Sequence, residues 1–163
     1  MNIKQMVIVG MADLNVVKNP GVLTTLGLGS CVGIALYEPL AKVAGLAHCM
    51  LPDSTKIQNN SIEAKFVDTA VARLLAEMQK IGANRRLIKA KVAGGAQMFA
   101  FNAANDMMRI GDRNVEATIK VLGAQGIPIL AKDTGNTYGR TVELYSETGD
   151  FLIKTIGHGS KKI

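Results

Sequence analysis

The stretch from Thr24 to Pro52, TTLGLGSCVGIALYEPLAKVAGLAHCMLP, decides the fold. It is apolar and β-branched enough to be buried, and the turn signal at residues 38–41 (EPLA) separates two apolar runs. These runs, Val32–Tyr37 and Lys42–Met50, are predicted to lie side by side as antiparallel strands. Buried strands seldom contain hydroxyls, thiols and an imidazole unless these groups are used, and this stretch contains all three. We therefore expect a functional site here.

The rest of the chain predicts further strands and two helices. Strands are expected at Met6–Val9, Val22–Leu26, Arg86–Val92, Ile127–Lys132, Thr141–Tyr145 and Phe151–Ile156, with a connection at Ala12–Gly21, a polar loop at Pro52–Asn60 and an irregular segment at Asn102–Arg109. Apolar residues at three- and four-residue spacing predict a helix over Ser61–Ile81, capped by Ser61 and ended by Gly82. A second helix is expected at about Asn114–Gln125, and the tail GHGSKKI is expected to be frayed. Strands and helices that do not strictly alternate predict an α+β fold, with helices on the outside of a sheet.

Length and composition limit the class of protein. The 163 residues fit one domain, spanning 1–163. The net charge of +6 suits an acidic protein partner better than nucleic acid, because aromatic residues make up only 4% and no nucleic-acid-binding motif is present. No apolar run reaches the roughly 20 residues of a membrane-spanning helix, and no cleavable leader is recognisable, so we expect a cytoplasmic protein without membrane insertion. Two cysteines give no disulfide framework.

The glycine turn of the deciding stretch has some likeness to a phosphate-binding loop. Gly27, Gly29 and Gly33 give the pattern G-x-G-x-x-x-G, which is one residue longer than the dinucleotide fingerprint. A strand-like run follows it instead of a helix, and no G-K-[ST] sequence is present. The pattern therefore argues against phosphate binding.

A metal site is the second alternative. Cys31, His48 and Cys49 are three residues of the types that bind zinc. Adjacent residues on a strand point to opposite faces, so His48 and Cys49 cannot face the same ion. A site with Cys31 and His48 alone would lack ligands.

Cysteine catalysis is the third alternative, against the plain possibility of an inert buried thiol. Cys31 follows the Gly29–Ser30 turn, where backbone amides can stabilise an oxyanion. A nearby His48 would take the thiol proton and later protonate a leaving group. Thr24 or Thr25, on the adjacent strand, is able to orient the imidazole.

These residues lie in motifs that resemble a known family. The runs are LGLGSCVGIALYEP, AHCMLP, AKVAGGAQMF, IGDRN and DTGNTYGR, in this order along the chain. Together they resemble CheD, the chemoreceptor glutamine deamidase of bacterial and archaeal chemotaxis, from about Val17 to Lys154. One departure is Asn136, where the family commonly has a second glycine; Asn also adopts left-handed dihedrals.

The resemblance implies a fold, an activity and partners. The expected fold is one of packed β-sheets with helices outside, like the catalytic domain of cytotoxic necrotizing factor toxins. Cys31 would be the nucleophile, His48 the base and acid, and Thr25 the residue that orients the histidine, with no cofactor. The expected substrates are glutamine side chains on the cytoplasmic helices of methyl-accepting chemotaxis receptors. The resemblance also implies binding to the CheY phosphatase CheC, which restrains the enzyme. A non-catalytic CheC-binding regulator is the competing interpretation.

Overall fold

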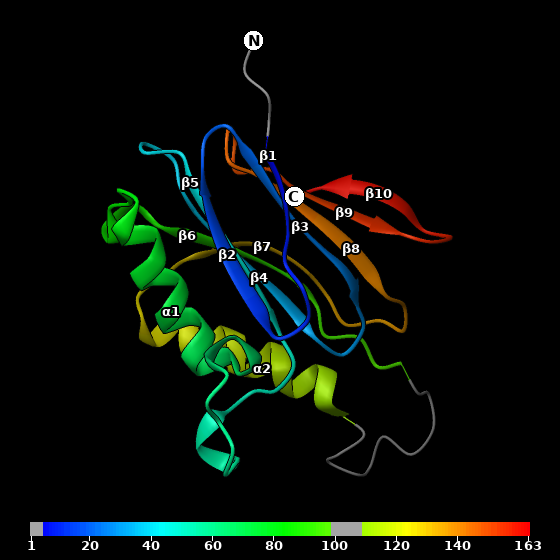
Figure 1. Cartoon of the computed structure of the whole chain (residues 1–163). Coiled ribbons are helices and arrows are strands. Elements are labelled where there is room, and N and C mark those ends of the chain that lie inside the picture. The colour runs from blue at the N-terminus through cyan, green and yellow to red at the C-terminus, as the bar shows by residue number, and fades with distance from the viewer. Residues whose placement is uncertain (1–4, 99–108) are drawn as a thin grey trace.

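Two five-stranded sheets pack face to face, and both helices cover the outer face of one of them (Figure 1). The computed structural model describes residues 5–98 and 109–163. Within these residues the first sheet has the order β1(Gln5–Ile8), β3(Gly21–Leu28), β8(Arg140–Tyr145), β9(Phe151–Thr155), β10(Gly159–Lys162). The second has the order β2(Asp13–Lys18), β5(Val43–Cys49), β4(Val32–Glu38), β6(Lys89–Gly94), β7(Ile129–Thr134). Neighbouring strands are antiparallel except in the pairs β1–β3 and β6–β7, which are parallel.

The helices are α1(Val67–Lys80) and α2(Ile110–Ala124), and short 3-10 turns occur at Ser54–Lys56, Glu63–Lys65 and Arg85–Leu87. The arrangement confirms the predicted α+β class with helices outside. The further likeness to necrotizing factor toxins and the single domain over 1–163 stay predictions. No helix in the described parts of the chain is long and apolar enough to cross a membrane.

β4 and β5 are buried on both faces of the second sheet, which explains the apolar character of residues 32–49. Alternate residues of β4 and β5 belong to two different cores. Val32, Ile34 and Val43 pack against the helices, whereas Ala35 and Leu46 pack against the first sheet. A strand covered on both faces needs apolar residues at nearly every position. The predicted antiparallel pairing is confirmed, with Val32 opposite Cys49 and Glu38 opposite Val43.

Two strands occur where the sequence predicted none. The expected connection at Ala12–Gly21 contains β2, which pairs along its whole length with β5 as an edge strand. Its burial alternates, as expected for an edge strand with one face on the core. The tail is not frayed: β10 pairs with β9 from Gly159 to Lys162 although every residue of β10 is exposed. Main-chain hydrogen bonds and two ion pairs, Lys161–Asp133 and Lys162–Asp150, hold this strand, so no apolar pattern marks it.

The first helix begins later than predicted, and Ser61 does not cap it. Phe66 occupies the N-cap position without a side-chain hydrogen bond. A parallel bridge joins Phe66 to Leu51, and the N–H of Val67 donates to the Leu51 carbonyl oxygen at 3.0 Å. This tertiary contact keeps the backbone extended at Phe66, although the apolar spacing predicted a helix that begins at Ser61. The irregular segment predicted at Asn102–Arg109 lies outside the described residues, except for Arg109.

Candidate active site

The candidate nucleophile sits where the chain crosses from one sheet to the other. β3 of the first sheet ends at Leu28, a short turn follows, and Cys31 immediately precedes β4 of the second sheet. The crossing begins at a register shift after Thr25, where Gly27 has a φ of 67°. Cys31 is only 8% exposed and belongs to the core between the two sheets.

His48 lies on the same face of the second sheet as Cys31. It is paired with Gly33 of β4, and Cys31 precedes Gly33 by two residues. Because side chains alternate along a strand, residues two apart share a face. Ala44 and Leu46, on the same face of β5 as His48, pack in the core between the sheets together with Cys31. The strand pairing therefore brings the thiol and the imidazole to one region, as the sequence predicted.

Thr25 approaches His48 from the facing sheet. Its Oγ1 lies 2.7 Å from His48 Nδ1 and donates to the carbonyl oxygen of Val9 at 2.6 Å. A threonine hydroxyl has one proton, so with that proton given to Val9 it accepts from His48 Nδ1–H. Nδ1 then carries the imidazole proton, and Nε2 presents its lone pair. His48 Nε2 is buried and forms no hydrogen bond with any described residue.

The structure distinguishes between the two threonines that the residue types left open. Thr24 is also buried, but its Oγ1 donates to the Val142 carbonyl oxygen of β8 at 2.8 Å. Adjacent residues of a strand point to opposite faces, so the Thr24 side chain points away from the core between the sheets. Only Thr25 reaches the imidazole. The sequence could not predict the contact between Thr25 and the Val9 carbonyl oxygen, because every residue has a main-chain carbonyl and the residue type does not mark which one is used.

Burial favours the neutral forms of both candidate groups. Desolvation raises the pKa of the Cys31 thiol, and the backbone N–H of Cys31 acts in the opposite direction. Desolvation also lowers the pKa of His48 below its ordinary value near 6.5. The resting site is therefore a neutral thiol and a neutral imidazole. Such a pair needs the imidazole to act as a general base when the thiol attacks.

Two glycines at the end of β6 hold the turn that carries Cys31. Gly94 and Gly95 have φ values of 99° and 68°, a region that favours glycine. A Cβ atom on Gly94 would overlap the Cys31 carbonyl oxygen. With no side chain there, the N–H of Gly95 donates to the Cys31 oxygen and that of Ala96 to the Gly29 oxygen, both at 2.8 Å. The double glycine therefore supports the turn of residues 29–31, the candidate nucleophile turn.

The same contacts bear on the predicted oxyanion donors at Gly29 and Ser30. A trans peptide directs its C=O and N–H to opposite sides. Because the Gly29 carbonyl points to Ala96, the N–H of Ser30 points away from that loop. The role of these amides in holding an oxyanion remains a prediction.

The second cysteine, Cys49, and the second histidine, His158, have different surroundings from Cys31 and His48. Cys49 is completely buried in the core between the second sheet and the helices, opposite to Cys31, and burial raises the pKa of its thiol. His158, in the turn between β9 and β10, stacks on Tyr138 with ring centroids 4.2 Å apart. Among residues 5–98 and 109–163, no three His, Cys, Asp or Glu side chains are grouped as metal ligands.

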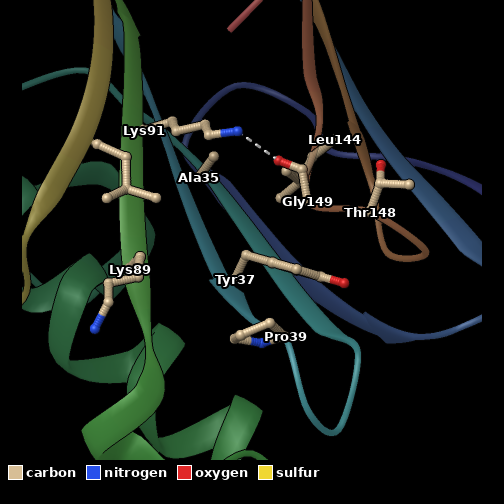
Figure 2. A pocket seen from close by; sticks show the side chains of 9 residues that line it. Ala35, Tyr37, Pro39, Lys89, Lys91, Leu144, Thr148 and Gly149 are labelled. Carbon is tan, nitrogen blue, oxygen red and sulfur yellow. Dashed lines mark hydrogen bonds between the residues drawn. The ribbon is translucent and has the colours of Figure 1, made fainter.

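A separate pocket of about 200 Å³ opens far from Cys31 (Figure 2). Ala35 and Tyr37 line it, and Lys91 donates across it to the Gly149 carbonyl oxygen at 2.9 Å. Tyr37 lies six residues beyond Cys31 along β4, which corresponds to about 20 Å at the rise of a strand. This pocket is therefore not part of the candidate active site.

A thiol and an imidazole on one face of a sheet, with the tautomer of the imidazole fixed by a third group, are the groups that a cysteine-dependent acyl-transfer site would need. The fold and site thus define a candidate cysteine hydrolase built between two β-sheets.

Comparisons with known proteins identify the family. The model of the family described as CheD chemotactic sensory transduction matches residues 50–155. A protein of Caldanaerobacter subterraneus subsp. tengcongensis, named probable chemoreceptor glutamine deamidase CheD, is 61% identical over 95% of this chain and 96% of its own. The chemoreceptor glutamine deamidase CheD of Halalkalibacterium halodurans is 54% identical over the same shares of the two chains. This chain belongs to the CheD family.

Among solved structures, the Bacillus licheniformis hypothetical protein YfiH is similar over 71% of this chain and 47% of its own, with 12% identity and a TM-score of 0.40. That likeness is too slight to bear on function. The two curated relatives extend the similarity to nearly the whole chain, including most of the part before residue 50 that the family model leaves unmatched.

Proposed function

We propose that this protein is a cysteine-dependent deamidase that converts selected glutamine side chains of chemoreceptors to glutamate. The observation that carries the proposal is the hydrogen bond between Thr25 and His48, because it leaves Nε2 as a base on the face that carries Cys31. The names of the relatives supply the substrate: they are chemoreceptor glutamine deamidases.

The first half of the reaction forms a thioester. His48 Nε2 takes the proton of the Cys31 thiol as the sulfur attacks the amide carbon of the glutamine. Backbone N–H groups of the turn before Cys31 stabilise the negative oxygen of the tetrahedral intermediate. His48 then gives its proton to the departing nitrogen, and ammonia leaves.

The second half releases the product. Water loses a proton to His48 and attacks the thioester carbon. The carbon–sulfur bond breaks, the Cys31 sulfur recovers its proton from His48, and the receptor is left with a glutamate. The sum is glutamine plus water giving glutamate plus ammonia, so the proposed reaction draws on no cofactor.

We further propose that CheC binds this protein and restrains it by covering the entrance to Cys31. The family resemblance supplies the partner, and the depth of Cys31 supplies the reason, since a residue only 8% exposed is easily closed off. Labelling of Cys31 by a small alkylating reagent should slow markedly when CheC is added. Unchanged labelling in the complex would mean that any restraint acts from a distant surface.

The proposal is tested by incubating the protein with cytoplasmic fragments of receptors and measuring both ammonia release and the mass gain of the Gln→Glu conversion. The wild type should modify particular glutamines, and Cys31→Ala should abolish the reaction while thermal denaturation shows a folded protein. A folded Cys31→Ala variant that releases ammonia at the wild-type rate contradicts the mechanism. Binding of CheC with no receptor modification by the wild type would favour the non-catalytic regulator.

A further inference from the structure

The carbonyl oxygen of Ser30 is held by a side chain. The carbonyls on either side of it, those of Gly29 and Cys31, accept from main-chain N–H groups of the loop after β6. The Ser30 carbonyl accepts from the side-chain amide of Asn114, with Nδ2 at 2.9 Å. Of the three contacts, it is therefore the one that a substitution can remove while leaving the backbone unchanged.

Asn114 also contacts the segment that carries the base. The same Nδ2 donates to the carbonyl oxygen of Met50 at 3.0 Å. Met50 follows β5 directly and lies two residues after His48. One buried amide on α2 therefore joins the residue before the nucleophile to the end of the strand that carries the histidine.

The position of Asn114 is fixed by close packing. It is fully buried in α2, and at the start of that helix a Cβ atom on Gly111 would overlap the Ala96 carbonyl oxygen. The helix is thus seated directly against the loop that supports the nucleophile turn. Two donor contacts from one nitrogen also fix which end of the amide points to the turn.

The asparagine side chain has both a favourable and an unfavourable effect on stability. Its Oδ1 is buried and has no hydrogen-bond partner among the described residues. A buried acceptor without a partner destabilises the folded state; an apolar side chain would avoid that penalty but would leave the Ser30 and Met50 carbonyl oxygens without this donor. What the asparagine provides, and an apolar residue would not, is the pair of donor contacts to Ser30 and Met50.

The contact with Ser30 determines the direction of the next amide. The Ser30 carbonyl and the Cys31 N–H belong to one trans peptide group and point to opposite sides. With the oxygen held toward Asn114, the N–H of Cys31 is turned the other way. That N–H acts on the sulfur of its own residue, where it favours the thiolate.

We propose that Asn114 is a positioning residue, which holds the Ser30–Cys31 peptide so that the Cys31 N–H faces the reacting sulfur and the oxyanion formed beside it. The part that concerns the oxyanion rests on the proposed deamidase function. The part that concerns the thiol does not, because it describes this chain without substrate.

The test compares Asn114→Ala and Asn114→Asp with a control on the same helix. Asn114→Asp keeps the volume and replaces the donor by an oxygen that repels the two carbonyls. Thr118→Val is the matched control, because Thr118 is equally buried on α2 and its Oγ1 donates only to the Asn114 main-chain oxygen, at 2.7 Å. Circular dichroism and thermal denaturation establish that each variant is folded.

Two readouts are measured: kcat and KM for receptor fragments, and the pH dependence of Cys31 alkylation by iodoacetamide, located by mass spectrometry. Loss of one oriented oxyanion donor lowers kcat by about 10²-fold. We expect both Asn114 variants to show a fall of that order with KM little changed, and the midpoint of alkylation to move to higher pH. Thr118→Val should show neither effect.

The outcomes separate the two proposals. Folded Asn114 variants with wild-type kcat and a wild-type alkylation profile overturn the role of Asn114. A wild type that modifies no receptor, combined with a shifted alkylation profile in the variants, overturns the deamidase and leaves the positioning role standing. If neither variant folds, the test is made on the wild type by NMR. The chemical shift of the Asn114 side-chain amide should change with pH as the Cys31 thiol titrates, and an unchanged shift refutes the inference.

Discussion

Replacing Thr25 with valine removes one oxygen atom from the core and preserves the shape of the side chain. Thr25 is completely buried, and its Oγ1 connects His48 Nδ1 at 2.7 Å to the Val9 carbonyl oxygen at 2.6 Å. The valine leaves a buried N–H and a buried carbonyl without this partner. It also removes the reason for the imidazole proton to stay on Nδ1.

The size of the effect follows from these two contacts. A buried polar group that loses its partner destabilises a protein by about 1–3 kcal/mol, so two such groups predict a loss of about 2–6 kcal/mol in the free energy of unfolding. A single hydrogen bond of about 1–1.5 kcal/mol that favours the active tautomer corresponds to about tenfold in rate. We therefore expect kcat to fall by about tenfold or more, while KM changes little because Thr25 is too deeply buried to contact substrate.

Two further variants isolate the cause. Thr25→Ser keeps the hydroxyl and should retain most of the activity. Thr24→Val removes a buried hydroxyl from the neighbouring position, where Oγ1 donates to the Val142 carbonyl oxygen at 2.8 Å, and should reduce stability without reducing kcat. The assay is ammonia release from receptor fragments, with urea denaturation for stability and side-chain ¹⁵N NMR for the His48 tautomer. The reasoning is refuted if folded Thr25→Val turns over as fast as Thr24→Val, or if Thr25→Ser is as slow as Thr25→Val.

Three other predictions use the same assay. Cys49→Ala should keep most of the activity and lose about 1–2 kcal/mol of stability, since it lies in the helix-side core; an inactive but folded variant would mean that the faces of β5 are misassigned. His158→Ala removes an exposed ring that is stacked on Tyr138 and should leave kcat unchanged; a loss comparable to that of His48→Ala would contradict the assignment. Because burial lowers the pKa of His48, the unfolded chain binds that proton first as the pH falls, so stability should decrease below about pH 6.5 and the acid limb of kcat/KM should lie below that value. An acid limb centred above about pH 6.5 would argue against a neutral His48 as the base.

The sequence was sufficient where burial leaves a strong pattern. The two continuous apolar runs predicted β4 and β5, and the folding-back of these strands predicted that Cys31 and His48 come together; the strand register places both on one face of the second sheet. The two-residue period placed Cys49 on the other face, where it lies among the helix-side core residues. These inferences depend only on strand geometry, which varies little between proteins.

The sequence was insufficient where tertiary contacts decide. β2 and β10 lie at sheet edges, where half or all of the residues are exposed and the apolar pattern is weak. Residue types alone did not choose between Thr24 and Thr25, because the choice depends on which face of β3 meets the other sheet; the family resemblance favoured Thr25. Asn114 lay in one of the recognised motifs, but its contacts with two distant carbonyls could not be predicted from that motif.

The hydrogen bonds to the three carbonyls of residues 29–31 determine when, during synthesis and folding, the candidate active site becomes ordered. Thr25, Cys31 and His48 all lie within the first 48 residues, yet the donors that hold the turn come from Gly95, Ala96 and Asn114. A growing chain therefore contains every proposed reacting group long before it contains the supports that orient them. Contacts so distant in sequence form late, because the loop between them must close first. An amino-terminal fragment that ends before Gly94 would contain the proposed triad without its supports, and the complete chain acquires its orientation only when α2 docks.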